Sequence, residues 1–246
     1  MESPVEPPRR FSLAIATLLF ATGFLVLAWP CLSVEVTIPW DAKSQFLPQV
    51  QFLAASIARG EWPFWTPNVF AGWPQIADPQ SLILSPLHLL LALAEPAPRF
   101  RDVDAVTFAY LFAGGFGIIA LFRERGWHIG GAVLAALMFA FGGSAASRLQ
   151  HTGQIMSLAY LALAIWLVER TFSRRSFAAA LAAGVVCGLL ANERDQVAML
   201  SLYLVAGFVL TQIFARPEVG RIRRALPLLT TMAGPALVVS AMPLVM

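Results

Sequence analysis

The stretch LILSPLHLLLAL at residues 82–93 decides the fold, because its path sets the side of a membrane on which every later segment lies. It is strongly apolar but only twelve residues long. A membrane-spanning helix needs about 20 residues, with roughly 17 as the short limit. Pro86 also interrupts the run. We therefore predict that 82–93 forms a helix on the membrane surface and does not cross.

The composition around this stretch is that of an integral membrane protein. Of the 246 residues, 58% are hydrophobic and only 13% are charged. A soluble domain carries about 25% charged residues, so this chain could not cover a globular surface with polar groups. The net charge is +3, but the arginines stand in short clusters between apolar runs. Such clusters indicate membrane topology, and we predict no nucleic-acid partner.

Seven further apolar runs are long enough, or can be extended enough, to span a bilayer. They cover 11–31, 105–122, 129–146, 155–168, 176–191, 197–214 and 225–246. The first lacks a cleavage site and is expected to stay as a signal anchor. The last stops at Met246 with no polar tail, which suggests that 1–246 is a single membrane domain at the N-terminus of a longer protein.

The basic residues set the expected orientation. With seven spans and the N-terminus inside, the cytoplasmic segments hold eleven of the seventeen basic residues, whereas the short outer loops hold only Arg148 and Arg194. If 82–93 crossed, three arginine clusters would face outward, against the positive-inside rule. The eleven residues are Arg9, Arg10, Arg123, Arg125, Arg170, Arg174, Arg175, Arg216, Arg221, Arg223 and Arg224.

This topology leaves a long first outer loop, about 32–104, with structure of its own. Phe46, Val50, Leu53 and Ile57 repeat at helical spacing and predict an amphipathic helix. Pro48 suits its first turn and Gly60 its C-terminal end. We expect this helix to lie in the membrane interface with its apolar face toward the lipid. The tryptophans and prolines that follow favour an ordered structure on the bilayer.

Asp41 is the leading candidate for chemistry in this loop. It stands about ten residues after the first span, where a carboxylate can reach a substrate whose head group lies at the bilayer surface. It could act as a general base on an acceptor hydroxyl, or help to hold a divalent cation together with Asp78. The structural alternative is a helix N-cap, which is a common role of aspartate.

Three other polar segments fall on the same predicted side. Arg148 and His151 could bind a phosphate, or could belong to an ordinary solvated loop. Asp78 and Gln80 could bind a substrate or could form a turn. Glu193, Arg194 and Asp195 could likewise bind a substrate, or could be polar caps on two helix ends.

The first loop resembles that of YfhO-type bacterial membrane proteins. The matching positions are Asp41, Gln45, Pro48, GEWPFWTPN at 60–68, GWP at 72–74, DPQ at 78–80, SPL at 85–87, and FGG at 141–143 followed by His151. That family in turn resembles the GT-C glycosyltransferases. Its members are usually much longer and carry a C-terminal soluble part.

The resemblance implies an all-α, GT-C-like enzyme in the bacterial cytoplasmic membrane. Its donor would be a polyprenyl-phosphate sugar, and its acceptor a cell-surface glycan, polymer or lipid on the extracytoplasmic side. Asp41 would be the functional acid of the first loop, with Gln45 near the substrate. Two alternatives stay open: a transporter or flippase for a lipid-linked glycan, and a non-catalytic membrane scaffold. Inverted repeats and helices broken at mid-membrane, which are typical of transporters, are not found in the sequence.

Overall fold

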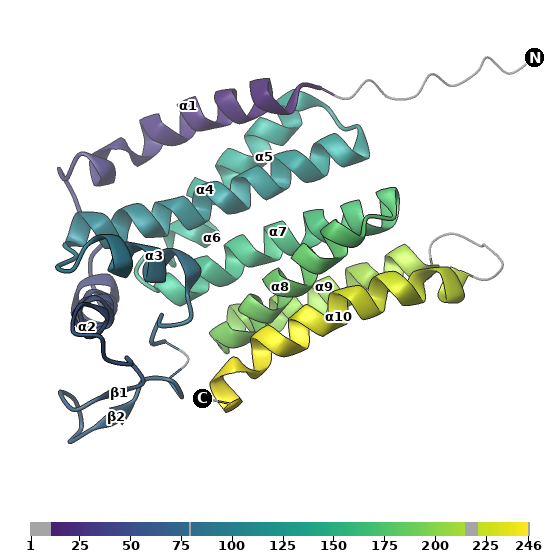
Figure 1. Cartoon of the computed structure of the whole chain (residues 1–246). Helices are drawn as coiled ribbons and strands as arrows, with labels where there is room; N and C mark the ends of the chain where they lie inside the picture. Colours follow the sequence, from purple (N-terminus) through teal and green to yellow (C-terminus); the bar gives the residue numbers. More distant parts are fainter. Residues whose placement is uncertain (1–10, 79, 215–220, 246) are drawn as a thin grey trace, which may run out of the picture.

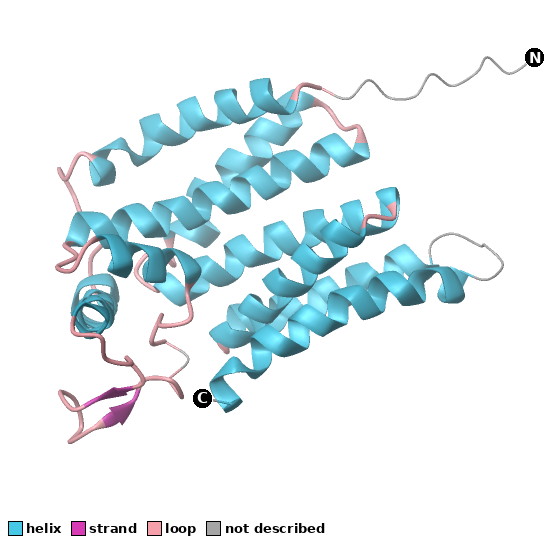
Figure 2. Ribbon diagram, in the orientation of Figure 1, coloured by secondary structure: helices cyan, strands magenta, loops and turns pink. Residues whose placement is uncertain are grey.

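The chain folds into a helical bundle with a small structured cap, seen in a computed structural model that describes residues 11–78, 80–214 and 221–245 (Figures 1 and 2). In chain order the elements are α1 (Leu13–Leu32), a π-helical turn η1 (Ala42–Phe46), α2 (Leu47–Ala58), β1 (Trp65–Thr66), β2 (Trp73–Pro74), α3 (Pro86–Ala94), α4 (Phe100–Arg125), α5 (Ile129–Phe141), α6 (Gly143–Ala146), α7 (Thr152–Arg174), α8 (Phe177–Glu193), α9 (Gln196–Phe214) and α10 (Arg221–Val245).

Within the described residues, six helices are long and apolar enough to cross a membrane: α1, α4, α5 with α6, α7, α9 and α10. The chain is therefore a multi-pass, all-α membrane protein. The predicted apolar run at 176–191 forms α8, whose 17 residues are shorter than the other candidates. The short run at 155–168 extends at both ends into the 23 residues of α7, as expected.

The long helices run back and forth between two ends of the bundle (Figure 1). We call one the arginine end, where α4 and α7 finish with Arg125 and Arg174. We call the other the loop end, where η1, α2, α3 and the two strands gather (Figure 1). α4 and α7 pack along each other at the centre, and both contain many buried residues.

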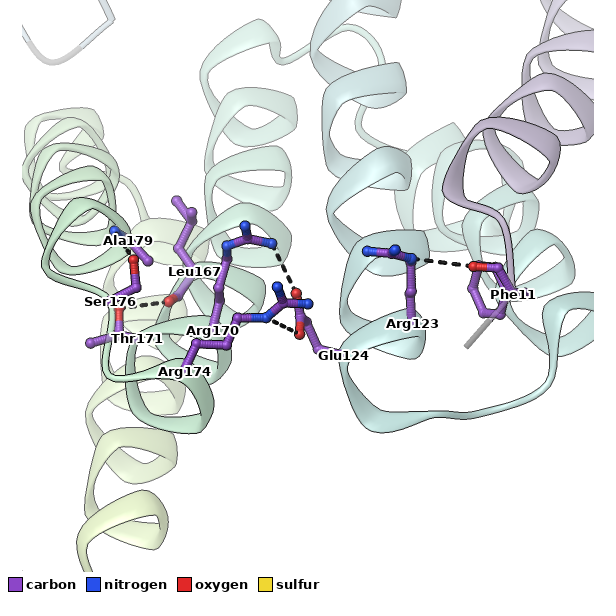
Figure 3. Close-up of polar contacts among 9 residues, drawn as sticks. All are labelled: Phe11, Arg123, Glu124, Leu167, Arg170, Thr171, Arg174, Ser176 and Ala179. Atoms are coloured by element: carbon purple, nitrogen blue, oxygen red, sulfur yellow. Dashed lines mark hydrogen bonds and ion pairs between the residues drawn. The ribbon is translucent and has the colours of Figure 1, made fainter. Parts of the chain in front are cut away.

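The arginine end is held together by ion pairs (Figure 3). Glu124, whose side chain is 2% exposed, lies 2.9 Å from both Arg170 and Arg174. Arg123 donates a hydrogen bond to the carbonyl of Phe11 at 3.2 Å, which ties α4 to the start of α1. Two of the clusters predicted to share one side therefore meet at one end, and Arg224 of a third lines a pocket there with Arg174 and Arg175. Arg9, Arg10 and Arg216 lie outside the described residues.

A second carboxylate completes this arrangement. Glu169 of α7 is paired with Arg125 of α4 at 2.6 Å and accepts a hydrogen bond from Gln212 of α9 at 2.9 Å. These contacts join α4, α7 and α9 at the arginine end.

The predicted amphipathic helix exists, but its apolar face packs against protein and not toward lipid. Val50 and Leu53 are fully buried, in two different apolar clusters of the protein. Pro48 lies in the first turn of α2, as expected. At the other end Gly60 adopts φ 72°, and the amides of Gly60 and Glu61 bond to the carbonyls of Ile57 and Ser56. This is the Schellman motif that the glycine predicts.

The stretch that decides the fold forms a shorter helix than predicted. α3 begins only at Pro86, because residues 82–85 form a tight turn in which Leu82 has φ 57° and Ser85 bonds to the carbonyl of Leu82 at 3.0 Å. α3 lies at the loop end and does not run along the bundle (Figure 1). Ile83 and Ala92 pack with Leu53 of α2 in a small apolar cluster at the loop end.

The tryptophan-rich segment forms an ordered hairpin, in which Trp65 pairs with Pro74 and Thr66 with Trp73. Gly72 adopts φ 121°, and a Cβ at this position would lie 2.3 Å from the Trp65 ring. Only glycine fits this position, because the backbone conformation and the lack of space exclude a side chain.

The last helix packs closely on α8 through two glycines spaced four residues apart. A Cβ on Gly184 would lie 2.2 Å from the carbonyl oxygen of Met232, and one on Gly188 would lie 2.6 Å from Cβ of Val239. Asn192 also donates a hydrogen bond to the carbonyl of Val239 at 2.9 Å. Small residues at such spacing let two membrane helices approach closely.

Candidate functional site

The first candidate residue, Asp41, contacts a second candidate, His151. Nδ1 of His151 lies 3.2 Å from Oδ2 of Asp41, and the two side chains are 36% and 45% exposed. Asp41 precedes η1, but its side chain makes no capping hydrogen bond there. The N-cap alternative is therefore wrong for this side chain. The pair stands at the loop end and is open to solvent.

Two elements far apart in the sequence position this pair. On one side, the segment between α1 and η1 is fixed by Asp104 of α4, a buried carboxylate that the sequence analysis did not single out. Asp104 accepts hydrogen bonds from the Thr37 hydroxyl at 2.7 Å and the Ile38 amide at 3.1 Å. On the other side, His151 is the N-cap residue of α7. The Asp41 carboxylate therefore lies beside the N-terminus of α7.

The surroundings of His151 indicate which ring nitrogen carries the proton. Nε2 of His151 lies 3.3 Å from Nε2 of Gln150, an amide nitrogen that can only donate. With this amide orientation, Nε2 of the imidazole accepts and Nδ1 carries the hydrogen. Nδ1 then donates to Asp41, which orients the carboxylate and leaves its second oxygen available.

Gln45 and Gln80 also come together. Nε2 of Gln45 donates to Oε1 of Gln80 at 2.5 Å, which links η1 to the segment before α3. Asp78 forms the turn that its sequence suggests, since its Oδ1 accepts from the Gln80 amide at 2.9 Å. Its other oxygen accepts from the Trp73 indole at 3.3 Å.

The remaining candidates, Glu193, Arg194 and Asp195, surround the junction of α8 and α9. Glu193 and Arg194 line a small polar cavity of about 20 Å³ together with Asp78. Asp195 caps α9 through the Ala198 amide at 2.8 Å, as the structural alternative predicted. Its other oxygen accepts a 2.8 Å hydrogen bond from Ser157 of α7.

The start of α7 connects the two groups. Gly153 follows His151, the residue that contacts Asp41, by two positions in the sequence. A Cβ on Gly153 would lie 3.4 Å from Oε2 of Glu193 and 3.9 Å from Oδ2 of Asp195. The first turn of α7 is therefore lined by carboxylates on both sides.

The two arginine candidates differ in their contacts. Arg148 donates within its own turn, to the Ser144 carbonyl and the Ser147 hydroxyl, each at 3.3 Å. Arg194 is exposed, adopts φ 49°, and forms no ion pair among the described residues. It is available to a phosphate.

The carboxylates that could hold a divalent cation stay in separate contacts. Asp41 pairs with His151, whereas Asp78 contacts Trp73 and Gln80. In the described part of the chain, no three His, Cys, Asp or Glu side chains come together as ligands of a metal ion.

Sequence reasoning missed a buried chain of hydroxyl groups behind this site. The Ser85 hydroxyl lies 2.7 Å from both Nδ1 of His88 and the hydroxyl of Tyr110, which in turn accepts from Tyr160 at 3.3 Å. His88 is fully buried, and burial lowers its pKa from 6.5 to about 3. The imidazole is therefore neutral and supports the packing of α3 on α4. The position of Ser85 directly before Pro86 gave no signal of this role.

Comparisons with models of protein families, with curated proteins and with solved structures found no match for this chain. The resemblance to YfhO-type proteins therefore stays a prediction.

Proposed function

We propose that the protein is a membrane glycosyltransferase that moves a sugar from a polyprenyl-phosphate carrier to a cell-surface acceptor. The observation that carries this proposal is the Asp41–His151 contact of 3.2 Å. In this contact an imidazole orients a half-exposed carboxylate at the loop end of the bundle, where we expect a lipid-linked head group to lie. A general base needs this combination of reach and orientation.

The proposed step is a single displacement at the anomeric carbon of the donor sugar. Asp41 accepts the proton of an acceptor hydroxyl as that oxygen forms its bond to the anomeric carbon. The bond between this carbon and the phosphate oxygen breaks, and its electron pair leaves with the polyprenyl phosphate. His151 acts as a positioning residue, because its Nδ1 holds one oxygen of Asp41.

Arg194 would bind the departing phosphate, since charge-assisted hydrogen bonds from a guanidinium match phosphate oxygens. It lies beside Asp78 and Glu193 at the small cavity between the cap and α8. Arg148 is a second candidate from the loop that leads to His151.

The proposal includes a topology of seven spans, in which the shorter helix α8 crosses the membrane in addition to the six long apolar helices. α3 lies outside the bilayer in this topology. The arginine end then faces the cytoplasm and the loop end the extracytoplasmic side. The gathering of Arg123, Arg125, Arg170 and Arg174 at one end supports this orientation, because basic residues are retained in the cytoplasm.

Single cysteines test this orientation in a Cys31→Ala, Cys187→Ala background. Asn68→Cys, Gln150→Cys and Gln196→Cys should react with a membrane-impermeant thiol reagent on cells stripped of any outer membrane. Gly126→Cys and Ser173→Cys should react only after the membrane is opened. Labelling of Gly126→Cys and protection of Gln150→Cys on intact cells would refute the topology and the mechanism together.

The activity itself is tested with purified protein in detergent. Labelled polyprenyl-phosphate sugar is mixed with a cell-envelope extract, and transfer of label to an acceptor is measured. Transfer in detergent supports an enzyme, whereas a flippase requires a sealed bilayer to produce any signal. No transfer in detergent, combined with movement of the lipid across sealed vesicles, would overturn the proposal.

A further inference from the structure

The loop end contains a groove that the mechanism above does not use. It has a volume of about 580 Å³ and lies between η1 with α2 on one side and the tryptophan hairpin with Gln75, Asp78 and Gln80 on the other. Pockets for small organic ligands are about 300–1,000 Å³, so the groove can hold one or two sugar rings.

The walls of the groove are rich in amides and contain one carboxylate, that of Asp78, which accepts hydrogen bonds from the Trp73 indole and the Gln80 amide. The side chains of Gln45, Gln49, Gln75 and Gln80 line it, and among its described lining residues there is no lysine, arginine or histidine. A phosphate would find no cation here. A ligand with many uncharged hydroxyl groups would find both donors and acceptors.

Two of these amides have buried oxygens without a partner. Oε1 of Gln49 and Oε1 of Gln75 are buried and form no hydrogen bond with any described residue, and the whole Gln75 residue is only 5% exposed. A buried acceptor without a donor is unfavourable. Both residues line the groove, and rotation of either amide toward it would let a hydroxyl group of a ligand supply the missing donor.

Aromatic rings complete the groove. Phe52 and Trp73 line it, and the Trp73 indole is held in place by its 3.3 Å hydrogen bond to Asp78. Such a ring offers an apolar surface beside polar groups. A sugar presents the same combination, because one face of its ring carries C–H groups and its rim carries hydroxyls.

We propose that this groove binds the acceptor as an uncharged oligosaccharide. The role of this glycan as the acceptor rests on the proposed function. The binding of a glycan in the groove does not depend on that function. Gln45 lines the groove and lies one helical turn after Asp41, so a glycan bound there extends toward the proposed base.

The test measures the intrinsic tryptophan fluorescence of the full chain in detergent during titration with three uncharged trisaccharides: maltotriose, cellotriose and chitotriose. At least one should give a saturable change. Trp73→Phe should remove the signal, whereas Trp62→Phe should keep it, because Trp62 is exposed in the same loop but does not line the groove. Inorganic phosphate should have no effect.

Gln75→Leu should weaken binding by about tenfold or more, since it removes a hydrogen-bond acceptor in a desolvated site. Its thermal stability should not fall, because the unpartnered oxygen is also removed. Gln49→Leu is an independent second variant. No saturable change with any trisaccharide, a signal that survives in both leucine variants, or binding of an uncharged peptide alone would overturn the proposal.

The outcomes separate this inference from the proposed function. Asp41→Asn should leave sugar binding unchanged. Binding without any transfer would refute the transferase and retain the groove as a glycan site. Transfer that is unaffected by Gln75→Leu, with no sugar binding, would refute the groove alone.

Discussion

The two ends of the bundle use their charged residues in different ways. At the arginine end each buried carboxylate is paired with guanidinium groups, as Glu124 is with Arg170 and Arg174. At the loop end Asp41 is paired with an imidazole and is half exposed, and Arg194 is open to solvent. Charges that satisfy one another hold helices together, whereas charges left open to solvent can bind a ligand. Substitutions at the two ends should therefore separate stability from activity.

The largest effect is expected for Asp41→Asn. Loss of a general base costs about 10²–10⁴-fold in rate. Sugar transfer in detergent should fall by this factor, while the amount of protein in the membrane and its thermal unfolding stay unchanged. Glu61→Gln is the matched control, because Glu61 is a 58% exposed acid of the same loop whose ion pair among the described residues is with Arg59. Full activity in Asp41→Asn would remove Asp41 from the mechanism.

Glu124→Gln should show the opposite pattern at the arginine end. It leaves two guanidinium groups without their carboxylate, and breaking such a pair typically costs 3–5 kcal/mol. We expect about 3 kcal/mol, because Arg170 and Arg174 are 36% and 35% exposed. Thermal unfolding in detergent measures the loss. Transfer below the unfolding temperature should be retained, and a selective loss of activity would break the distinction between the two ends.

The third prediction concerns His88. Burial lowers the pKa of its imidazole from 6.5 to about 3. Below pH 6.5 the unfolded chain gains a proton at His88 that the folded chain does not bind until about pH 3. The free energy of unfolding should therefore fall by about 1.4 kcal/mol per pH unit through this window as the pH is lowered. Above pH 6.5 this contribution is fully present.

Unfolding temperatures measured from pH 7 to pH 4 check this slope. His88→Gln should flatten it, whereas His128→Gln at the arginine end keeps His88 and should keep the slope. An unchanged slope in His88→Gln would mean that another group causes the acid sensitivity.

The smallest effect on stability is expected for Arg194→Gln. This side chain has no ion-pair partner in the described part of the chain, so the free energy of unfolding should change by no more than about 0.5 kcal/mol. The KM for the donor should rise about tenfold, because a charged hydrogen bond to phosphate is lost. Arg170→Gln is the matched substitution, and it should lower stability without raising this KM. Equal effects of both variants on KM would contradict the assignment.

Much of the fold follows from local patterns in the sequence. The apolar runs located the long helices, and the length and proline of 82–93 correctly indicated a segment that does not run along the bundle. Gly60 marked the end of α2 because a Schellman motif depends on only a few neighbouring residues.

The site was harder to predict, because its contacts depend on tertiary packing. Asp41 and His151 could be assigned to one end, but their contact depends on the register between the first loop and α7. The lipid-facing orientation predicted for α2 was wrong, since an apolar helix face does not reveal whether lipid or protein covers it. Asp104 gave no signal either, because a single acid near a helix start is common.

The close approach of α8 and α10 also has a consequence for how the protein is made. α8 is only 17 residues long, and eight of these are alanine or glycine, which would contribute little transfer free energy to membrane insertion in the proposed topology. It therefore depends on neighbouring helices more than the other segments do. α8 leaves the ribosome before α10, so Gly184 and Gly188 stay uncovered until synthesis has passed Val239. A nascent chain that is halted in this interval presents an incompletely packed α8.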